Sequence, residues 1–280
     1  MVLESIFNPF IVKKKPWEMF GAGFIYALVG LVLSYFVFRE ASGLLMVFLI
    51  VMAALPLLFT TIKNEEELDL GTSSEFTLLK EHSKVLLFML FLFLGITVAL
   101  AGAYVILPQK VVDTVFSMQE QAIMNVNSNI QGNVTHFFLF QKIFINNIKV
   151  LMFCILFSFL YGTGAIFILT WNASVVAVAI GNLFKSEIAS VASYAGLSSI
   201  SAYFSAASFS FFRYMTHGFL EVVAYLIAGI AGGIISIAIV RNNWQNEKVL
   251  IDAIDMILLS FGVLLIAGIV EVYVTPMIIS

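Results

Sequence analysis

The chain has 280 residues, of which 61% are hydrophobic and only 11% are charged, and its formal net charge is −3. This composition excludes an ordinary soluble globular domain and indicates an integral membrane protein. The net charge shows no excess of basic residues that would indicate nucleic-acid binding. The single cysteine, Cys154, excludes an intramolecular disulfide framework. We expect contact with a lipid bilayer and with other membrane proteins or further copies of the chain, no nucleic acid and no cofactor.

The first segment, residues 1–19, places apolar residues before its lysines, which is the reverse of a secretory signal. It is therefore expected to be retained and to lie at the membrane interface. Lysines and arginines occur mainly at the ends of the apolar runs, and their uneven distribution predicts a cytoplasmic N-terminus in the cell membrane. Residues 1–280 are expected to form a single membrane domain.

Long, continuous apolar runs predict an all-α bundle of about six membrane-spanning helices rather than a β-barrel. The polar residues 63–84 are expected to form a solvated connector. The amphipathic stretch 108–147 is expected to lie outside the membrane, and it carries a glycosylation sequon at Asn133. The predicted spans are 20–38, 44–62, 85–107, 148–170, 211–240 and 254–274.

The stretch that follows the fourth span is the least regular part of the predicted bundle. Residues 171–184 are apolar but short for a crossing, so a re-entrant or broken helix is expected there. Asn172 would then cap the new half-helix, or it would line a cavity between broken helices together with Gly162, Thr163 and Asn147. The sequence leaves the path of residues 185–212 undetermined.

The last two spans carry acidic residues and a histidine, which are rare inside membranes. His217 and Glu221 lie one helical turn apart. Small residues continue the same helical stripe, namely Ala224, Ala228, Gly232 and Ser236. Because such residues mark helix–helix contacts in membranes, the stripe predicts that His217 and Glu221 face a neighbouring helix. A second stripe marks a packing face on the first span: Gly23, Ala27, Gly30 and Ser34.

Glu271 lies near the end of the last span, on a helical face shared with small residues such as Ala267 and Gly268. A short connection joins the last two spans, so they are expected to be antiparallel neighbours. That arrangement places the end of one helix beside the start of the other. We therefore predict an intramembrane polar cluster in which His217, Glu221 and Glu271 lie at similar depth.

Three interpretations of this cluster stay open at the level of sequence. Buried polar groups must be paired whatever the function, so the three side chains can be structural contacts alone. An ionised acid at a helix centre costs about 2.5–3.5 kcal/mol, so a proton relay or a cation site is a second interpretation. A catalytic metal site is the third, but none of the three histidines lies in an H-E-x-x-H pattern. We predict neither a metal nor a catalytic residue.

Three segments carry a family resemblance: "NNIKVLMFCILFSFLYGTGAIFILTWNASVVAVAIGN", "THGFLEVVAYLIAGIAGG" and "IAGIVEVYVTP". They resemble the stage II sporulation protein M-like membrane proteins, and "KEHSKVLLFMLFLFLG" resembles the archaeal members in particular. The sporulation member of that family works beside peptidoglycan-remodelling partners and has no known catalytic role itself. The resemblance therefore implies a protein without a known catalytic role.

Two functional hypotheses follow from the resemblance and from the polar cluster. The first is a non-enzymatic component of a membrane- or envelope-remodelling complex. The alternative is a transporter or channel in which Glu221 and Glu271 handle protons or cations and His217 tunes them. An intramembrane hydrolase is a third possibility, for which the chain shows no nucleophile motif.

Overall fold

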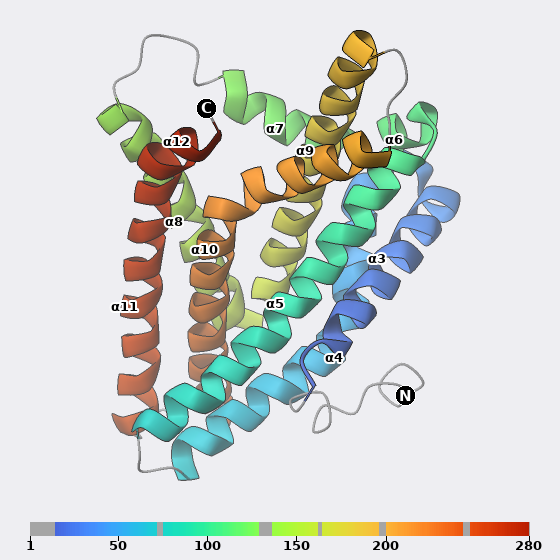
Figure 1. The fold of residues 1–280 in the computed structure, drawn as a ribbon. Coiled ribbons are helices and arrows are strands. Elements are labelled where there is room, and N and C mark those ends of the chain that lie inside the picture. The colour runs from blue at the N-terminus through green and yellow to red at the C-terminus, as the bar shows by residue number, and fades with distance from the viewer. Residues whose placement is uncertain are drawn as a thin grey trace.

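The computed structural model describes residues 15–71, 75–128, 136–161, 164–195, 200–242 and 247–279. These residues form a helical bundle (Figure 1), which confirms the predicted all-α class. Within the described ranges, seven helical segments are long and apolar enough to cross a membrane, compared with about six expected from the sequence.

The helices follow one another with short connections. Two single turns depart from α-helical geometry: η1 is a 3₁₀ turn between the first two spans, and η2 is a π-helical turn near the C-terminus. In chain order the elements are α3 (Glu18–Val37), η1 (Arg39–Ala41), α4 (Ser42–Gly71), α5 (Glu75–Ile106), α6 (Gln109–Val115), α7 (Ser117–Ser128), α8 (His136–Tyr161), α9 (Ala165–Ala195), α10 (Ile200–Val240), α11 (Glu247–Ile269), η2 (Val270–Val274) and α12 (Thr275–Ile279).

The prediction of a broken helix at residues 171–184 is wrong. Helix α8 ends at Tyr161, and α9 runs without interruption from Ala165 to Ala195, so 171–184 lie inside a full-length span. The predicted span 148–170 is accordingly divided between two helices. Apolar residues flank the connection on both sides, and for this reason hydropathy alone misplaced the boundary. Gly162 and Thr163 lie outside the described residues.

Several helices extend beyond the predicted spans. The expected connector 63–84 is mostly helical, because α4 continues to Gly71 and α5 begins at Glu75. Glu, Leu and Lys are good helix formers, so the chain has no local reason to stop its helix at the membrane boundary. The stretch 108–147 contains α6, α7 and the first turns of α8. Residues 1–14 and Asn133 lie outside the described residues.

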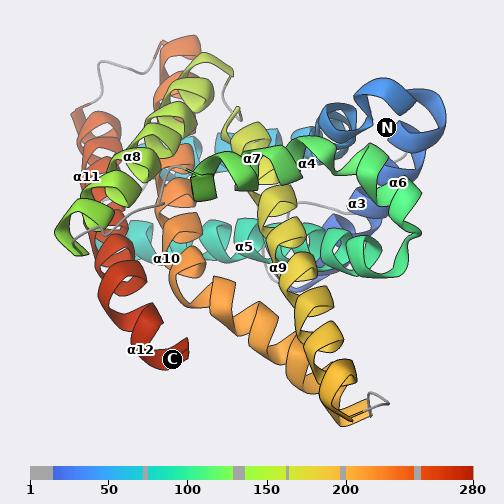
Figure 2. The same ribbon diagram turned by 90° about the horizontal axis from the view of Figure 1, so that it is seen from above.

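Helix α10 is the centre of the bundle and packs against α8, α9 and α11. Within its most apolar window, 83% of the residues are buried, compared with 22% for α8 and 33% for α11. Figures 1 and 2 show that the first half of α10 runs across the bundle and that its second half turns alongside α8 and α11. Of the undetermined stretch 185–212, residues 185–195 complete α9 and residues 200–212 begin α10.

Glycines set the closest helix contacts, as the two stripes predict. Gly23 of α3 lies against the Leu92 backbone carbonyl of α5, and a Cβ at Gly95 of α5 would meet the Phe20 carbonyl of α3. On α10, a Cβ at Gly232 would lie 2.8 Å from the Ile155 carbonyl oxygen of α8. Such backbone contacts leave no room for a side chain, and they hold α3 on α5 and α10 on α8.

Candidate functional site

Three elements meet at two carboxyl groups and one amide. The Asn147 amide nitrogen of α8 donates a hydrogen bond to Glu221 Oε1 of α10. The side chains of Glu221 and Glu271, the latter in η2, are hydrogen-bonded to each other. Glu271 Oε2 is buried and has no hydrogen-bond partner among the described residues. We call Asn147, Glu221 and Glu271 the carboxyl cluster.

The hydrogen bond between the two acids determines how many protons the cluster must hold. An ionised carboxylate only accepts hydrogen bonds, so two carboxyl groups can bond to each other only when at least one is protonated. Sharing one proton leaves a single negative charge, which costs less to bury than two. The Asn147 amide donates to that charge. In this arrangement the cluster therefore holds at least one proton, and loss of that proton would break the contact between the two acids.

Glu271 lies in the π-helical turn η2, whose extra residue changes the backbone bonding locally. The Thr275 backbone N–H bonds to the Val270 carbonyl, and the Thr275 hydroxyl lies 3.1 Å from the same oxygen. Single π-helical turns inside α-helices occur frequently at functional sites. One local feature of the sequence accompanies this turn: Pro276 has no backbone N–H, so it cannot bond to the Val272 carbonyl as an ordinary helical residue would.

His217 lies beside the carboxyl cluster. It is half-buried, one helical turn before Glu221, and its Nδ1 is 3.4 Å from Thr275 Oγ1. Within the part of the chain that the structure describes, no hydrogen bond joins His217 to Glu221, although the two lie one helical turn apart. The threonine, which the sequence analysis did not single out, instead links the imidazole to η2. Which of the two atoms donates depends on the histidine tautomer.

The carboxyl cluster is close to one boundary of the membrane. Glu221 is separated from Arg241 by roughly 30 Å of helix at about 1.5 Å per residue, which is about the thickness of a hydrocarbon core. Lys149, two residues after Asn147 on α8, is exposed, and so is Arg213, two turns before Glu221 on α10. Exposed basic side chains typically lie at the membrane interface. Water on that side is therefore within a few helical turns of the cluster.

The predicted cavity group is not assembled as expected. Asn147 belongs to the carboxyl cluster, while Asn172 lies inside α9, two turns after its start, and so does not cap a helix. The Asn172 amide nitrogen is buried without a partner in the described structure. Across the described ranges, no three His, Cys, Asp or Glu side chains gather in a way that could hold a metal ion.

Two further polar contacts link helices that the sequence could not pair. The Tyr104 hydroxyl of α5 lies 2.6 Å from both Glu120 Oε1 of α7 and Asn182 Oδ1 of α9. His82 Nε2 of α5 lies 3.0 Å from Asp252 Oδ2 of α11. Each partner was visible in the sequence as a polar residue near an apolar run. Their pairing depends on which helices are neighbours, and hydropathy does not specify that.

Comparison with known families places the cluster inside a recognised domain. A family model described as stage II sporulation protein M matches residues 84–276, from the third turn of α5 into α12. The match includes the whole carboxyl cluster and leaves α3 and α4 outside. Comparisons with curated proteins and with solved structures give no match. Because the family match covers more than half of the chain, this multi-span membrane protein belongs to the stage II sporulation protein M family.

Proposed function

We propose that this protein exchanges protons within the membrane and that the carboxyl cluster is its proton-binding site. The observation that carries the proposal is the contact between the carboxyl groups of Glu221 and Glu271, which exists only while the pair holds at least one proton. A structural contact would need no ionisable pair, because an amide and a carboxyl group can bond in the same way. Two adjacent acids therefore favour a role in proton binding.

We infer that neighbouring side chains carry protons between water and the carboxyl cluster. Arg213 is exposed, His217 is half-buried one turn further along α10, and Thr275 lies between the imidazole and η2. Histidine gains and loses a proton near neutral pH, which suits a relay between water and a buried acid. A second proton on the carboxyl cluster would make the pair neutral. Neutralisation lowers the cost of moving η2 relative to α10 in a low-dielectric environment, and so couples protonation to helix movement.

The test is proton flux into liposomes that contain the purified protein and a pH-sensitive dye, driven by an imposed membrane potential. We expect flux in the wild type and its loss in Glu221→Gln and in Glu271→Gln, because glutamine cannot bind a proton. Asp255→Asn, at an exposed acid of α11, is the matched control and retains the flux. Wild-type liposomes that behave like protein-free liposomes would overturn the proposal.

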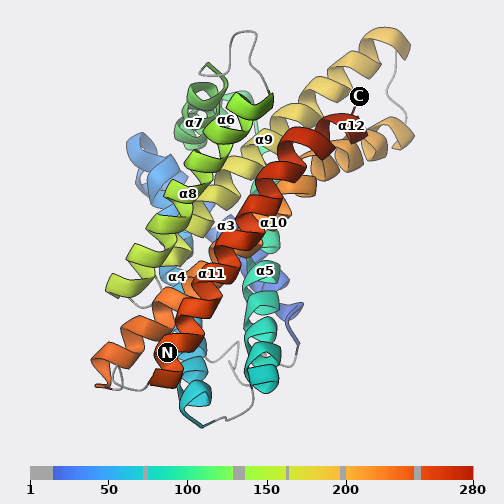
Figure 3. The same cartoon turned by 90° about the vertical axis from the view of Figure 1, so that its left-hand side faces the viewer.

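A second candidate function is a non-enzymatic component of a membrane- or envelope-remodelling complex. Two observations favour it: the match to the stage II sporulation protein M family, and the exposed apolar faces of α8 and α11. Figure 3 shows α11 and α8 together on one side of the bundle. A photo-crosslinking residue at Phe153 of α8, which is exposed, should join one partner of defined mass in native membranes. The same residue at exposed Phe36 of α3 should not.

The cytoplasmic N-terminus is likewise part of this proposal. It would place the Arg241 end of α10 inside the cell and the carboxyl cluster near the outer face. Val240 and Ile106 are both 83% exposed, and they lie at opposite ends of the bundle. Because the native Cys154 is buried, a new cysteine at either position can be labelled selectively. A membrane-impermeant maleimide should label Ile106→Cys but not Val240→Cys in intact cells; the reverse pattern would invert the topology.

A further inference from the structure

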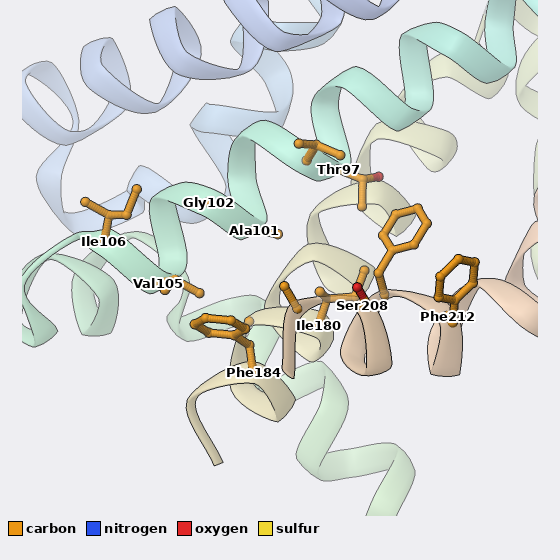
Figure 4. Close-up of a pocket in the computed structure, with 13 residues that line it drawn as sticks. Thr97, Ala101, Gly102, Val105, Ile106, Ile180, Phe184, Ser208 and Phe212 are labelled. Atoms are coloured by element: carbon orange, nitrogen blue, oxygen red, sulfur yellow. The ribbon is translucent and has the colours of Figure 1, made fainter. Parts of the chain in front are cut away.

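An open apolar groove of about 460 Å³ lies between α5, α9 and the first half of α10 (Figure 4). Its walls include Gly102 and Ile106 of α5, Phe184 of α9, and Phe211 and Phe212 of α10. None of the carboxyl cluster residues lines it. The groove is therefore separate from the proposed proton site.

The lining restricts what can fill the groove. It contains no charged side chain, and its Thr97 hydroxyl already donates a hydrogen bond to the Phe93 carbonyl at 2.9 Å. Water would find few partners there, and apolar cavities do not hold it stably. Ile106 is 83% exposed and Phe212 66% exposed, so the groove opens at the surface of the bundle. Its volume is in the range of ligand pockets, about 300–1,000 Å³. A hydrocarbon chain fits these conditions.

A basic side chain lies next to this apolar surface. Lys185 follows Phe184 on α9, and its ammonium nitrogen is 4.4 Å from the centroid of the Tyr104 ring and 3.4 Å from Gln109 Oε1. Both partners are neutral, and no carboxylate pairs with Lys185 among the described contacts. Two acids beside these partners bond to them and not to Lys185: Glu120 accepts from the Tyr104 hydroxyl, and Asp113 accepts from the Gln109 amide. The ammonium group thus retains its charge for an anionic ligand.

The position of the groove along the membrane normal agrees with a lipid. The first half of α10 exposes aromatic side chains, including Tyr203, Phe204 and Phe212. Phe184 and Tyr203 lie with their ring centroids 6.4 Å apart. Tyrosine concentrates at the level of lipid headgroups, and Tyr203 and Lys185 both lie beside Phe184 at this end of the groove. The groove therefore begins where a lipid phosphate meets its hydrocarbon chains.

We propose that this groove binds an anionic phospholipid, with one hydrocarbon chain between α5, α9 and α10 and the phosphate held by Lys185. Such a lipid would fill the space beneath the first half of α10 and join it to α5. The site would also make the conformation of α10 depend on the composition of the surrounding bilayer.

Gly102 offers a way to fill the groove without disturbing the bundle. A Cβ at this position would meet no atom within 4 Å, so Gly102→Phe can project its ring into the groove. Gly262 of α11 is the matched control, because a Cβ there also meets nothing within 4 Å and the residue does not line the groove. Lys185→Gln removes the charge and keeps a similar side-chain length.

The experiment reconstitutes full-length protein in vesicles of phosphatidylglycerol and phosphatidylcholine and counts retained lipids by native mass spectrometry after mild extraction. We expect the wild type and Gly262→Phe to retain one phosphatidylglycerol. In Gly102→Phe the fraction of protein that retains this lipid should be about tenfold lower than in the wild type. Lys185→Gln should keep one lipid but lose the preference for phosphatidylglycerol. The proposal is wrong if Gly102→Phe retains as much lipid as the wild type, or if the wild type retains none. An undiminished preference in Lys185→Gln would overturn the assignment of the phosphate.

Discussion

The contact between α3 and α5 and the contact between α10 and its partners α8 and α11 use the same packing device. In both, glycine lets a helix approach the backbone of its neighbour, at Gly23 and Gly95 in the first and at Gly232 in the second. Only the second adds a hydrogen-bonded carboxyl pair, near one end of the same interface. Helix α3 lies outside the region matched by the family, whereas α8, α10 and α11 lie inside it. Close apolar packing is thus sufficient for the contact between α3 and α5, whereas the acids of the second contact need a separate explanation.

The largest effect is expected where a side chain would meet backbone in the α3–α5 contact. Gly95→Ala would place a Cβ against the Phe20 carbonyl, so the helices must separate. We expect the free energy of unfolding in mixed detergent micelles to fall by about 1–3 kcal/mol. Gly21→Ala is the control, because a Cβ there meets no atom within 4 Å. Equal stability of the two variants would show that glycine does not set the distance between α3 and α5.

A smaller effect is expected from removing the amide of the carboxyl cluster. Asn147→Leu keeps a similar volume but leaves Glu221 Oε1 without its donor. The expected loss in the free energy of unfolding is about 1–2 kcal/mol, within the range of interhelical hydrogen bonds in membranes. Asn146→Leu, at the exposed neighbouring position, serves as the control. A double-mutant cycle with Glu221→Gln should show coupling; strictly additive changes would contradict the contact.

The contact between His82 of α5 and Asp252 of α11 lies outside the carboxyl cluster and should contribute about 1 kcal/mol to the free energy of unfolding. Asp252→Asn weakens the partly buried contact with His82, whose Nε2 lies 3.0 Å from Asp252 Oδ2. Asp255→Asn changes an exposed acid on the same helix and should alter the unfolding free energy by less than about 0.5 kcal/mol. A larger effect at Asp255 than at Asp252 would mean that this pair does not join the helices.

The smallest effect on stability, and the most informative one, is expected for Glu271→Gln. Its amide can donate to Glu221 in place of the shared proton, so the unfolding free energy should change by less than about 0.5 kcal/mol. Proton flux should nevertheless be lost. Normal flux in a stable Glu271→Gln variant would leave the cluster with a structural role only. The contact of α10 with its partners would then serve packing alone, as the contact between α3 and α5 does.

Hydropathy and residue spacing correctly predicted the all-α class and most of the helices. The structure brings Glu221 and Glu271 into contact, and a functional cluster that includes His217 stays a prediction. Regular small-residue spacing indicated which face of α10 packs inward, and Gly232 lies against α8 as that spacing requires. The break between α8 and α9 was misplaced because apolar residues continue on both sides of it. Thr275 was missed because its contact with His217 depends on how α10 and η2 pack, although the neighbouring Pro276 marks a disturbed helix there.

Composition and periodicity by themselves determined that this chain is a helical membrane protein and which faces of its helices avoid lipid. Both properties depend on the free energy of transferring single residues or single helices between water and hydrocarbon. They can therefore be predicted from the order of residues in the sequence. Only the tertiary structure decided that Asn147 bonds to Glu221, that His217 turns to Thr275, and that α5, α9 and α10 enclose a groove. Those contacts join helices far apart in sequence, and their geometry depends on how closely the backbones approach.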